Sequence, residues 1–150
     1  MSDLRALYEE VIIDHKKNPR NFREIDDATV KIDGFNPLCG DKLTLFLKLK
    51  DGVIEDISFV GSGCAISTAS TSLMTEALMG KTIADAERLF EDFHVLVTDE
   101  TDFEEKIAEV GKLAVLSGVR QYPSRVKCAT LSWHTLNAAL HGDSDPVTTE

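Results

Sequence analysis

Residues 43–60 read LTLFLKLKDGVIEDISFV, and this stretch decides the expected architecture. Leucine occupies every second position from 43 to 49, which is the period of a β-strand with one buried face. Asp51-Gly52 is a strong signal for a two-residue hairpin turn, and apolar residues resume at Val53. The stretch therefore predicts two antiparallel strands joined by a tight turn.

The segments on either side extend this pattern. Upstream, Val30 and Ile32 alternate with polar neighbours and predict a further strand, and an earlier helix ends at Asn18-Pro19. From Cys64 onward the apolar residues recur at helical spacing, which predicts helices through the rest of the chain. The apolar positions of these helices are Ile66, Ala69, Leu73 and Ala77; Ile83, Ala86, Phe90 and Phe93; Phe103, Ile107, Val110 and Ala114; and Val126, Ala129, Trp133, Leu136 and Leu140.

The expected fold class is α+β. Strands and helices in separate runs predict a small antiparallel three-stranded sheet that is packed on one face by about five helices. We expect residues 1–150 to form a single domain, because domains usually have about 100–200 residues. Thr101 and Glu104 form a capping-box pattern ahead of the fourth helix, and the polar tail from Gly142 is predicted to fray.

The composition limits the possible partners. A net charge of −10 argues against nucleic acid as a partner, because binding phosphates requires clustered Lys and Arg. No apolar run reaches the roughly 20 residues that a membrane helix needs, so no membrane association is predicted. The N-terminus lacks the basic and apolar regions of a secretory signal. With an odd count of three cysteines, these features predict a cytoplasmic protein with reduced thiols.

The three cysteines all fall at the ends of predicted elements. Cys39 lies in the loop NPLCGDK (36–42), Cys64 follows Gly61-Ser-Gly63, and Cys128 lies near the start of the last helix. Each cysteine taken alone also fits a small buried hydrophobic residue. Three thiols with the carboxylate of Asp41 match the ligand set of a tetrahedral zinc or cluster site. Their separations match no zinc-finger spacing, so the spacing alone leaves both interpretations open.

Four segments extend the argument beyond spacing. VIIDHKKNPRNF (11–22), NPLCGD (36–41), GSGCAIS (61–67) and RVKCATLSW (125–133), in this order, resemble the IscU/NifU-like iron–sulfur cluster assembly family over nearly the whole chain. The resemblance implies an IscU/SufU-like fold, in which a small antiparallel sheet is packed by helices. It also implies one site that handles metal or sulfur. The residues that match that site are Cys39, Asp41, Cys64 and Cys128.

Three departures within the family resemble its SufU-type branch. Lys127 stands where the cluster scaffolds carry a histidine, the segment 122–126 reads YPSRV in place of their Leu-Pro-Pro-Val-Lys motif, and residues 81–120 form a longer insertion. The resemblance implies a zinc-dependent sulfurtransferase. Such a protein would accept persulfide sulfur on Cys39 from a PLP-dependent cysteine desulfurase of the SufS type. It would then pass the sulfur toward a downstream cluster-assembly scaffold.

The residue chemistry agrees with a zinc site and leaves two alternatives. A protonated Lys127 has no free lone pair, so the fourth ligand is Asp41 or water. Zinc with three thiolates and a carboxylate carries a net charge of about −2, which Lys127 and Arg125 are expected to offset. The main alternative is a scaffold that assembles a [2Fe–2S] cluster, with iron as the metal, on the same cysteines. A purely structural zinc module is a third, which Asp41 disfavours because structural sites use closed Cys/His sets.

Overall fold

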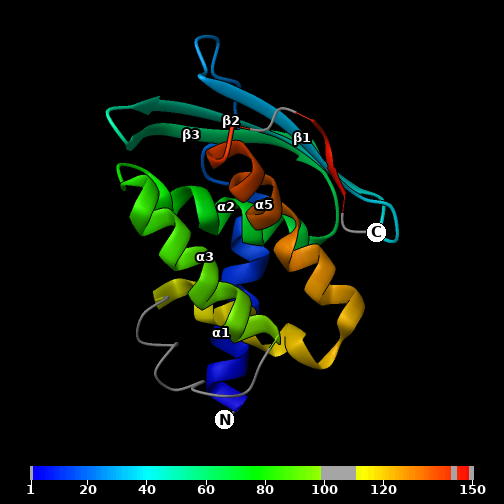
Figure 1. Cartoon of the computed structure of the whole chain (residues 1–150). Helices are drawn as coiled ribbons and strands as arrows, with labels where there is room; N and C mark the ends of the chain where they lie inside the picture. The colour runs from blue at the N-terminus through cyan, green and yellow to red at the C-terminus, as the bar shows by residue number, and fades with distance from the viewer. Residues whose placement is uncertain (1, 99–110, 143–144, 149–150) are drawn as a thin grey trace.

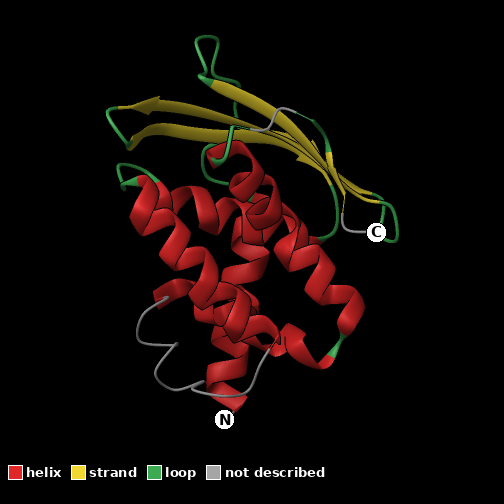
Figure 2. Cartoon of the chain, viewed as in Figure 1, coloured by secondary structure: helices red, strands yellow, loops and turns green. Residues whose placement is uncertain are grey.

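The structure is a computed structural model, and it describes residues 2–98, 111–142 and 145–148. A sheet lies along one side of the molecule, and the helices are gathered on one of its faces (Figures 1 and 2). The elements in chain order are α1 (Ser2–Lys17), β1 (Val30–Asn36), β2 (Asp41–Lys50), β3 (Val53–Ser62), α2 (Ala65–Leu78), α3 (Ile83–Thr98), the 3-10 helix η1 (Gly111–Gln121), α5 (Pro123–Leu140) and β4 (Val147–Thr148).

The predicted hairpin is confirmed. β2 and β3 pair antiparallel, and Asp51 and Gly52 adopt positive φ angles of 53° and 77°. A two-residue type I′ turn requires positive φ at both central positions, which explains why this turn uses Asp-Gly. The alternating leucines at 43, 45 and 47 are buried. Their side of the sheet packs on the helices, so the period-two pattern correctly identified the core face.

The predicted three-stranded antiparallel sheet was wrong in one respect. The strands are ordered β3-β2-β1-β4, and β4 pairs parallel to β1 through Gly34↔Val147 and Phe35↔Thr148. The sheet is therefore four-stranded and mixed, and part of the tail that was expected to fray is paired. A two-residue strand is too short to show a period-two pattern, and for this reason the sequence gave no signal for it.

The helix prediction also needs correction. In the described ranges there are four α-helices and the 3-10 helix η1, where about five helices were expected. The capping-box residues Thr101 and Glu104 lie outside the described residues. Where the predicted fourth helix would reach Ala114, the chain is already in η1, which contains Gly111 and Gly118. Glycine has a low α-helix propensity, which weakens the α-helical alternative here.

The core lies between the sheet and the helices. Phe93 of α3 and Trp133 of α5 are fully buried and stack with ring centroids 4.7 Å apart. α3 starts behind Thr82, whose Oγ1 accepts a hydrogen bond of 3.1 Å from the Asp85 N–H, as expected for an N-cap. Within the described ranges, no helix combines the length and hydrophobicity of a membrane span.

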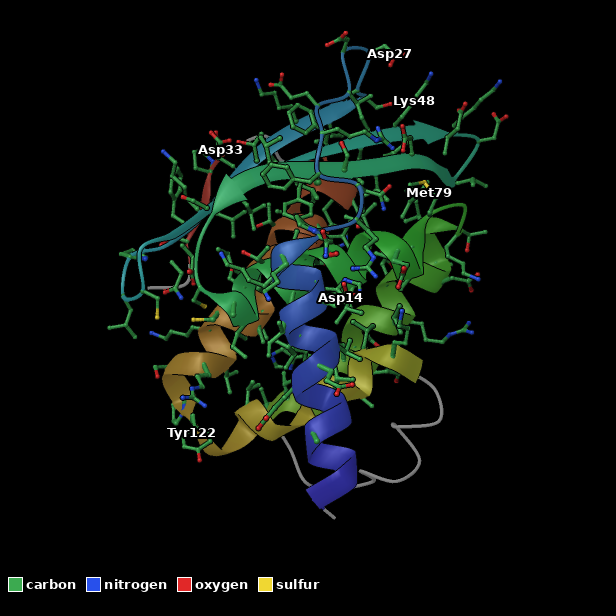
Figure 3. All side chains as sticks on the ribbon, turned by 180° about the vertical axis from the view of Figure 1, so that it is seen from behind. Asp14, Asp27, Asp33, Lys48, Met79 and Tyr122 are labelled. Atoms are coloured by element: carbon green, nitrogen blue, oxygen red, sulfur yellow. The ribbon has the colours of Figure 1, made fainter. Side chains whose placement is uncertain are left out.

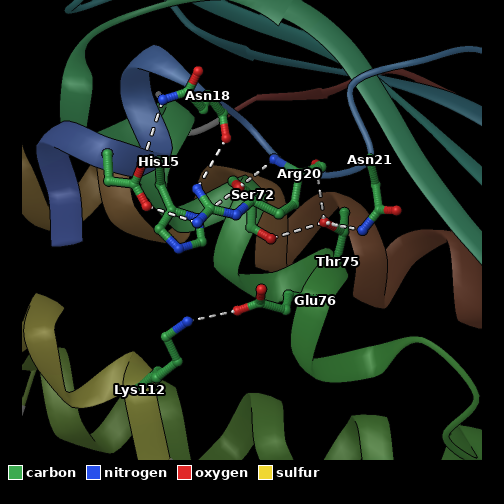
Figure 4. A network of polar contacts seen from close by, with 9 residues as sticks. His15, Asn18, Arg20, Asn21, Ser72, Thr75, Glu76 and Lys112 are labelled. Atoms are coloured by element: carbon green, nitrogen blue, oxygen red, sulfur yellow. Dashed lines mark hydrogen bonds and ion pairs between the residues drawn. The ribbon is translucent and has the colours of Figure 1, made fainter.

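A buried polar network joins α1 to α2 (Figure 4). His15 is only 1% exposed, and its Nδ1 lies 2.7 Å from the Ser72 Oγ. The same Oγ accepts the backbone N–H of Arg20 at 2.8 Å, while His15 Nε2 is buried without a hydrogen-bond partner in the described ranges. Burial, followed by the positive charge of Arg20, lowers the pKa of His15 below its ordinary value of 6.5. His15 is therefore a neutral structural residue in the folded chain.

We expect this histidine to make stability depend on pH. The unfolded chain takes up a proton on His15 near its ordinary pKa of 6.5, whereas the folded chain resists it. The free energy of unfolding should therefore be highest above that pH. Below pH 6.5, the titration of His15 should lower the free energy of unfolding by at most about 1.4 kcal/mol per pH unit, which is the value for one proton. The decrease should end once the pH has passed the folded-state pKa.

Urea denaturation between pH 5 and 8 measures this dependence. His15→Gln keeps a hydrogen-bonding group beside Ser72 but cannot titrate, so its stability should change less with pH over this range. The matched control is His141→Gln, because His141 is exposed at the end of α5. Parallel curves for the wild type and His15→Gln would show that His15 does not carry the effect.

Candidate functional site

The first part of the site is the turn between β1 and β2. Asn36 and Asp41 form the last pair of this ladder, and Gly40 has a φ of 71°, which an L side chain rarely adopts. Cys39 is exposed on the turn, and its backbone N–H donates to the Asn36 carbonyl at 3.3 Å. The turn thus presents a thiol at the surface beside a flexible glycine.

Asp41 is buried directly beneath this turn. Its side chain is held at both oxygens: Oδ1 accepts the Cys64 backbone N–H at 2.8 Å, and Oδ2 accepts the Asn36 side-chain amide at 3.1 Å. Only 2% of Asp41 is exposed. A methyl group added at Gly63 would lie 2.7 Å from Asp41 Oδ1, so glycine at 63 leaves room for this carboxylate. The fold therefore orients Asp41 before any ligand arrives.

Cys128 brings the last helix to the same place. Its Sγ lies 3.3 Å from the Cys39 Sγ and 3.5 Å from the Asn36 side-chain amide nitrogen. The ligand atoms of Cys39, Asp41 and Cys128 all lie within 4.8 Å of one another. This group joins residues 89 positions apart in the chain, and its three members offer two sulfur atoms and one oxygen atom to a shared centre.

Cys64 borders this group without belonging to it. It is the N-cap of α2, half-buried, and its Sγ accepts the Ser67 backbone N–H at 3.4 Å. The sulfur is thus engaged by the first turn of its own helix, although the Cys64 backbone holds Asp41. Three of the four predicted ligands therefore form one group, and the fourth, Cys64, adjoins it: its backbone N–H holds Asp41, and its side chain contacts that of Cys128.

The electrostatics of the site disfavour a free thiolate at Cys128. Burial leaves this residue 3% exposed and raises the pKa of its thiol far above the ordinary value, with further increases from contacts with Cys39, Cys64 and Asp41. A divalent cation removes this penalty, because metal ligation deprotonates a thiol. Clustered sulfur and carboxylate donors are the set that zinc accepts, so the residues present fit that ion.

The two predicted supporting cations lie at the surface. The Arg125 guanidinium carbon lies 4.7 Å from the centroid of the Tyr122 ring, which is exposed at the start of α5 (Figure 3). Lys127 is exposed and makes no hydrogen bond or ion pair with another described residue. Within the described part of the chain, neither side chain makes a hydrogen bond or ion pair with Cys39, Asp41 or Cys128, so an offset of charge would act through space.

Two contributors were missed from the sequence. Asn36 is fully buried and its amide bridges Asp41 and Cys128, but before Pro37 it was interpreted only as part of a turn. Lys16 of α1 donates a hydrogen bond of 3.0 Å to the Gly63 carbonyl, next to Cys64. The position of Asn36 beside the cysteine loop was the available signal. Nothing in the local pattern pointed to Lys16.

Comparisons with known proteins place this geometry in context. A family model described as the NifU-like N-terminal domain matches residues 7–139. The zinc-dependent sulfurtransferase SufU of Bacillus subtilis (strain 168) is 42% identical over 139 residues, which are 93% of this chain and 92% of that protein. The iron–sulfur cluster assembly scaffold protein IscU of Thermotoga maritima is 41% identical over 143 residues, which are 95% and 98% of the two chains. Relatives named for the two activities are thus about equally similar.

A solved structure shares the fold. FiSufU, described as a candidate iron–sulfur cluster assembly scaffold protein for the SUF system of Fervidobacterium islandicum AW-1, superimposes with a TM-score of 0.80. It is 36% identical, and the match covers 87% of this chain and 94% of that one. Similarity in sequence and in structure therefore extends over most of both chains.

Proposed function

This chain belongs to the NifU-like N-terminal domain family, and from that premise we propose that it is a zinc-dependent sulfurtransferase of iron–sulfur cluster assembly. The observation that carries the proposal is the pairing of an exposed thiol with a buried one. Cys39 Sγ lies 3.3 Å from Cys128 Sγ, with the buried carboxylate of Asp41 in the same group. Such a site offers one reactive sulfur to a partner and keeps the other ligands fixed.

The proposed zinc ligands are Cys39, Asp41, Cys64 and Cys128. Zinc bound there would keep the thiols deprotonated and add no redox chemistry of its own. Asn36 holds two of these ligands through its amide, and Cys64 holds Asp41 through its backbone N–H. Groups that orient a ligand in this way typically contribute about 10–100-fold to metal affinity.

The proposed reaction is a sulfur transfer between two thiols. The Cys39 thiolate, having released its proton to solvent, attacks the terminal sulfur of a persulfide on the partner enzyme. A new S–S bond forms on Cys39, the S–S bond of the donor breaks, and the donor leaves as a thiolate. No net oxidation occurs. Exposure at the turn gives Cys39 the access that this attack needs, whereas Cys128 is 3% exposed.

The partner that supplies such a persulfide is a PLP-dependent cysteine desulfurase. The recipient of the sulfur would be a cluster-assembly scaffold with acceptor thiols. The test mixes the zinc-loaded chain with a desulfurase and cysteine, and follows alanine release. We expect the rate to rise with the concentration of the chain until it saturates. An unchanged rate at saturating chain would contradict the proposal.

A second candidate function is a scaffold that assembles a [2Fe–2S] cluster on the same residues. The observation that favours it is the likeness to proteins named as IscU scaffolds, at 40% and 41% identity. Lys127, in the position before Cys128, argues against it, because a protonated lysine has no lone pair for a metal. The two functions are separated by asking whether stimulation of the desulfurase requires zinc. It should require zinc if the chain is a sulfurtransferase and should not if the chain is a scaffold.

We expect Asp41→Ala to weaken zinc binding by at least about tenfold. Loss of a group that only orients a ligand already lowers metal affinity by about 10–100-fold. The change also leaves two buried donors, the Cys64 N–H and the Asn36 amide, without their acceptor. Each unpaired buried donor costs about 1–3 kcal/mol of stability, so the melting temperature should fall while the chain still folds. Competition with a chromogenic chelator gives the affinity, and calorimetry gives the melting temperature.

Asp27→Ala is the matched control for this change. Asp27 is an exposed carboxylate paired with Lys48 at 2.7 Å, on the far side of the sheet from the helices (Figure 3). Exposed ion pairs contribute about 0–1 kcal/mol, so this variant should bind zinc as the wild type does. Asp41→Ala with wild-type zinc affinity and wild-type sulfur transfer would remove Asp41 from the site.

A further inference from the structure

Two histidines meet in an open cavity between α3 and α5, apart from the cysteine site. The cavity has a volume of about 600 Å³ and is lined by Phe90, Glu91, His94, Val95, His134 and Asn137. His134 follows Cys128 on α5 by six residues, so the two sites are separated by about 9 Å along the helix axis. Three of the four histidines of the chain lie on α3 or at α5, the third being His141.

The two imidazoles, one from each helix, meet in an edge-to-face arrangement. The ring centroids of His94 and His134 are 5.9 Å apart, with an angle of 72° between the ring planes. Phe90 contacts both rings, at 6.0 Å from His94 and 5.5 Å from His134. Both histidines are half-buried. No ring nitrogen of either histidine has a hydrogen-bond partner among the described residues, and both side chains line the cavity.

The packing of the core beneath the cavity fixes the positions of His94 and His134 relative to each other. The residues immediately before the histidines are Phe93 and Trp133, which stack in the interior with centroids 4.7 Å apart. This buried stack fixes how α3 and α5 lie against each other. The next residue along each helix is therefore presented at the same height. A site whose ligands are on packed helices is held more precisely than one on loops.

Oxygen donors lie beside both histidines at helical spacing. Glu91 precedes His94 by three residues, and Asn137 follows His134 by three, so each pair shares one helix face. All four side chains line the cavity. In helix bundles, a Glu-x-x-His pair of this spacing directs both side chains toward one metal ion. Imidazole nitrogen with carboxylate or amide oxygen suits divalent transition metals.

We propose that His94 and His134 form a second binding site for a divalent transition metal, with Zn²⁺ as the ion considered, and that Glu91 or Asn137 supplies an oxygen ligand. Zinc–nitrogen bonds of about 2.0–2.1 Å at a tetrahedral angle place two imidazole centroids about 5 Å apart. The observed 5.9 Å is slightly longer, and Glu91 would have to turn toward the histidines to join them, because its carboxylate and the two imidazoles do not form a group within 4.8 Å among the described residues. With a net charge of −10 on the chain, a cation at this face is also favoured electrostatically.

The ring nitrogens of the histidines report on this site directly. The full chain, first loaded with one equivalent of Zn²⁺, is titrated with further Zn²⁺ while the histidine ¹⁵N resonances are followed by NMR. The resonances of His94 and His134 should shift together and saturate. Those of His15, which is buried beside Ser72, and of His141 should stay in place.

Variants make the assignment specific. His94→Gln and His134→Gln should each weaken binding of the added zinc by roughly 100-fold, since losing a group that only orients a ligand already costs about 10–100-fold. His141→Gln is the matched control, because His141 pairs with Glu87 and does not line the cavity. Sulfur transfer should be unchanged in all three variants. Saturable binding that survives in both His94→Gln and His134→Gln, or His94 and His134 resonances that do not move, would overturn the proposal.

Discussion

Cys39→Ser is expected to abolish sulfur uptake by the chain. Treated with desulfurase and cysteine, the wild type should gain about 32 mass units on the peptide that contains Cys39, and the variant should gain none. The reason is access. Cys39 is exposed on the β1–β2 turn, whereas Cys64 caps α2 and Cys128 is 3% exposed. A thiol that cannot reach the partner cannot attack its persulfide.

Stimulation of the desulfurase should disappear in the same variant. The loss reflects removal of the acceptor and not of the fold, because serine at an exposed turn position leaves the buried contacts of Asn36 and Asp41 intact. Circular dichroism checks that point. If the added mass appears on Cys64 or Cys128 while Cys39→Ser still stimulates turnover, the acceptor is assigned wrongly.

Cys128→Ser is expected to have the largest effect on metal content. Cys128 is the buried thiol of the group, and its sulfur lies next to both Cys39 and the Asn36 amide. Serine keeps the size but replaces a soft thiolate by a hydroxyl that zinc binds poorly at neutral pH. Zinc affinity should fall by roughly 100-fold or more, given that loss of a merely orienting group costs about 10–100-fold. Mass spectrometry of the purified variant measures the zinc it retains.

Ser132→Ala provides the control on the same helix. Ser132 is buried one turn after Cys128, and its hydroxyl has no hydrogen-bond partner among the residues that the structure describes. Removing an unpaired buried hydroxyl should leave zinc content and stability close to those of the wild type. If Cys128→Ser retains full zinc while folding normally, Cys128 is not a ligand.

The hairpin, the N-cap of α3 and the core face could be predicted because their signals are local. Asp51-Gly52 requires positive φ, and Thr82 caps α3 within three residues of itself. β4 could not be predicted, because its two residues are held by pairing with β1, far away in the chain, and by the packing of Val147 against the core. A segment too short for a period takes its structure from its neighbour, which the local sequence does not describe.

The site divides in the same way. The turn that exposes Cys39 follows from Gly40, and the placement of Cys64 at a helix start follows from the change of period. The convergence itself depends on contacts such as that between Asn36 and Cys128, which are 92 residues apart. No periodicity reports a contact of that kind. The family resemblance supplied it, and the role of Asn36 emerged only from the fold.

The most direct test of the central claim is metal analysis of the chain purified without added metal or chelator. A zinc-dependent sulfurtransferase should contain about one zinc per chain, bound by the cysteine site. It should show no visible absorbance, because Zn²⁺ has a filled d shell and no redox chemistry. A brown protein that contains iron and sulfide in place of zinc would contradict the account and would identify the chain as a cluster scaffold.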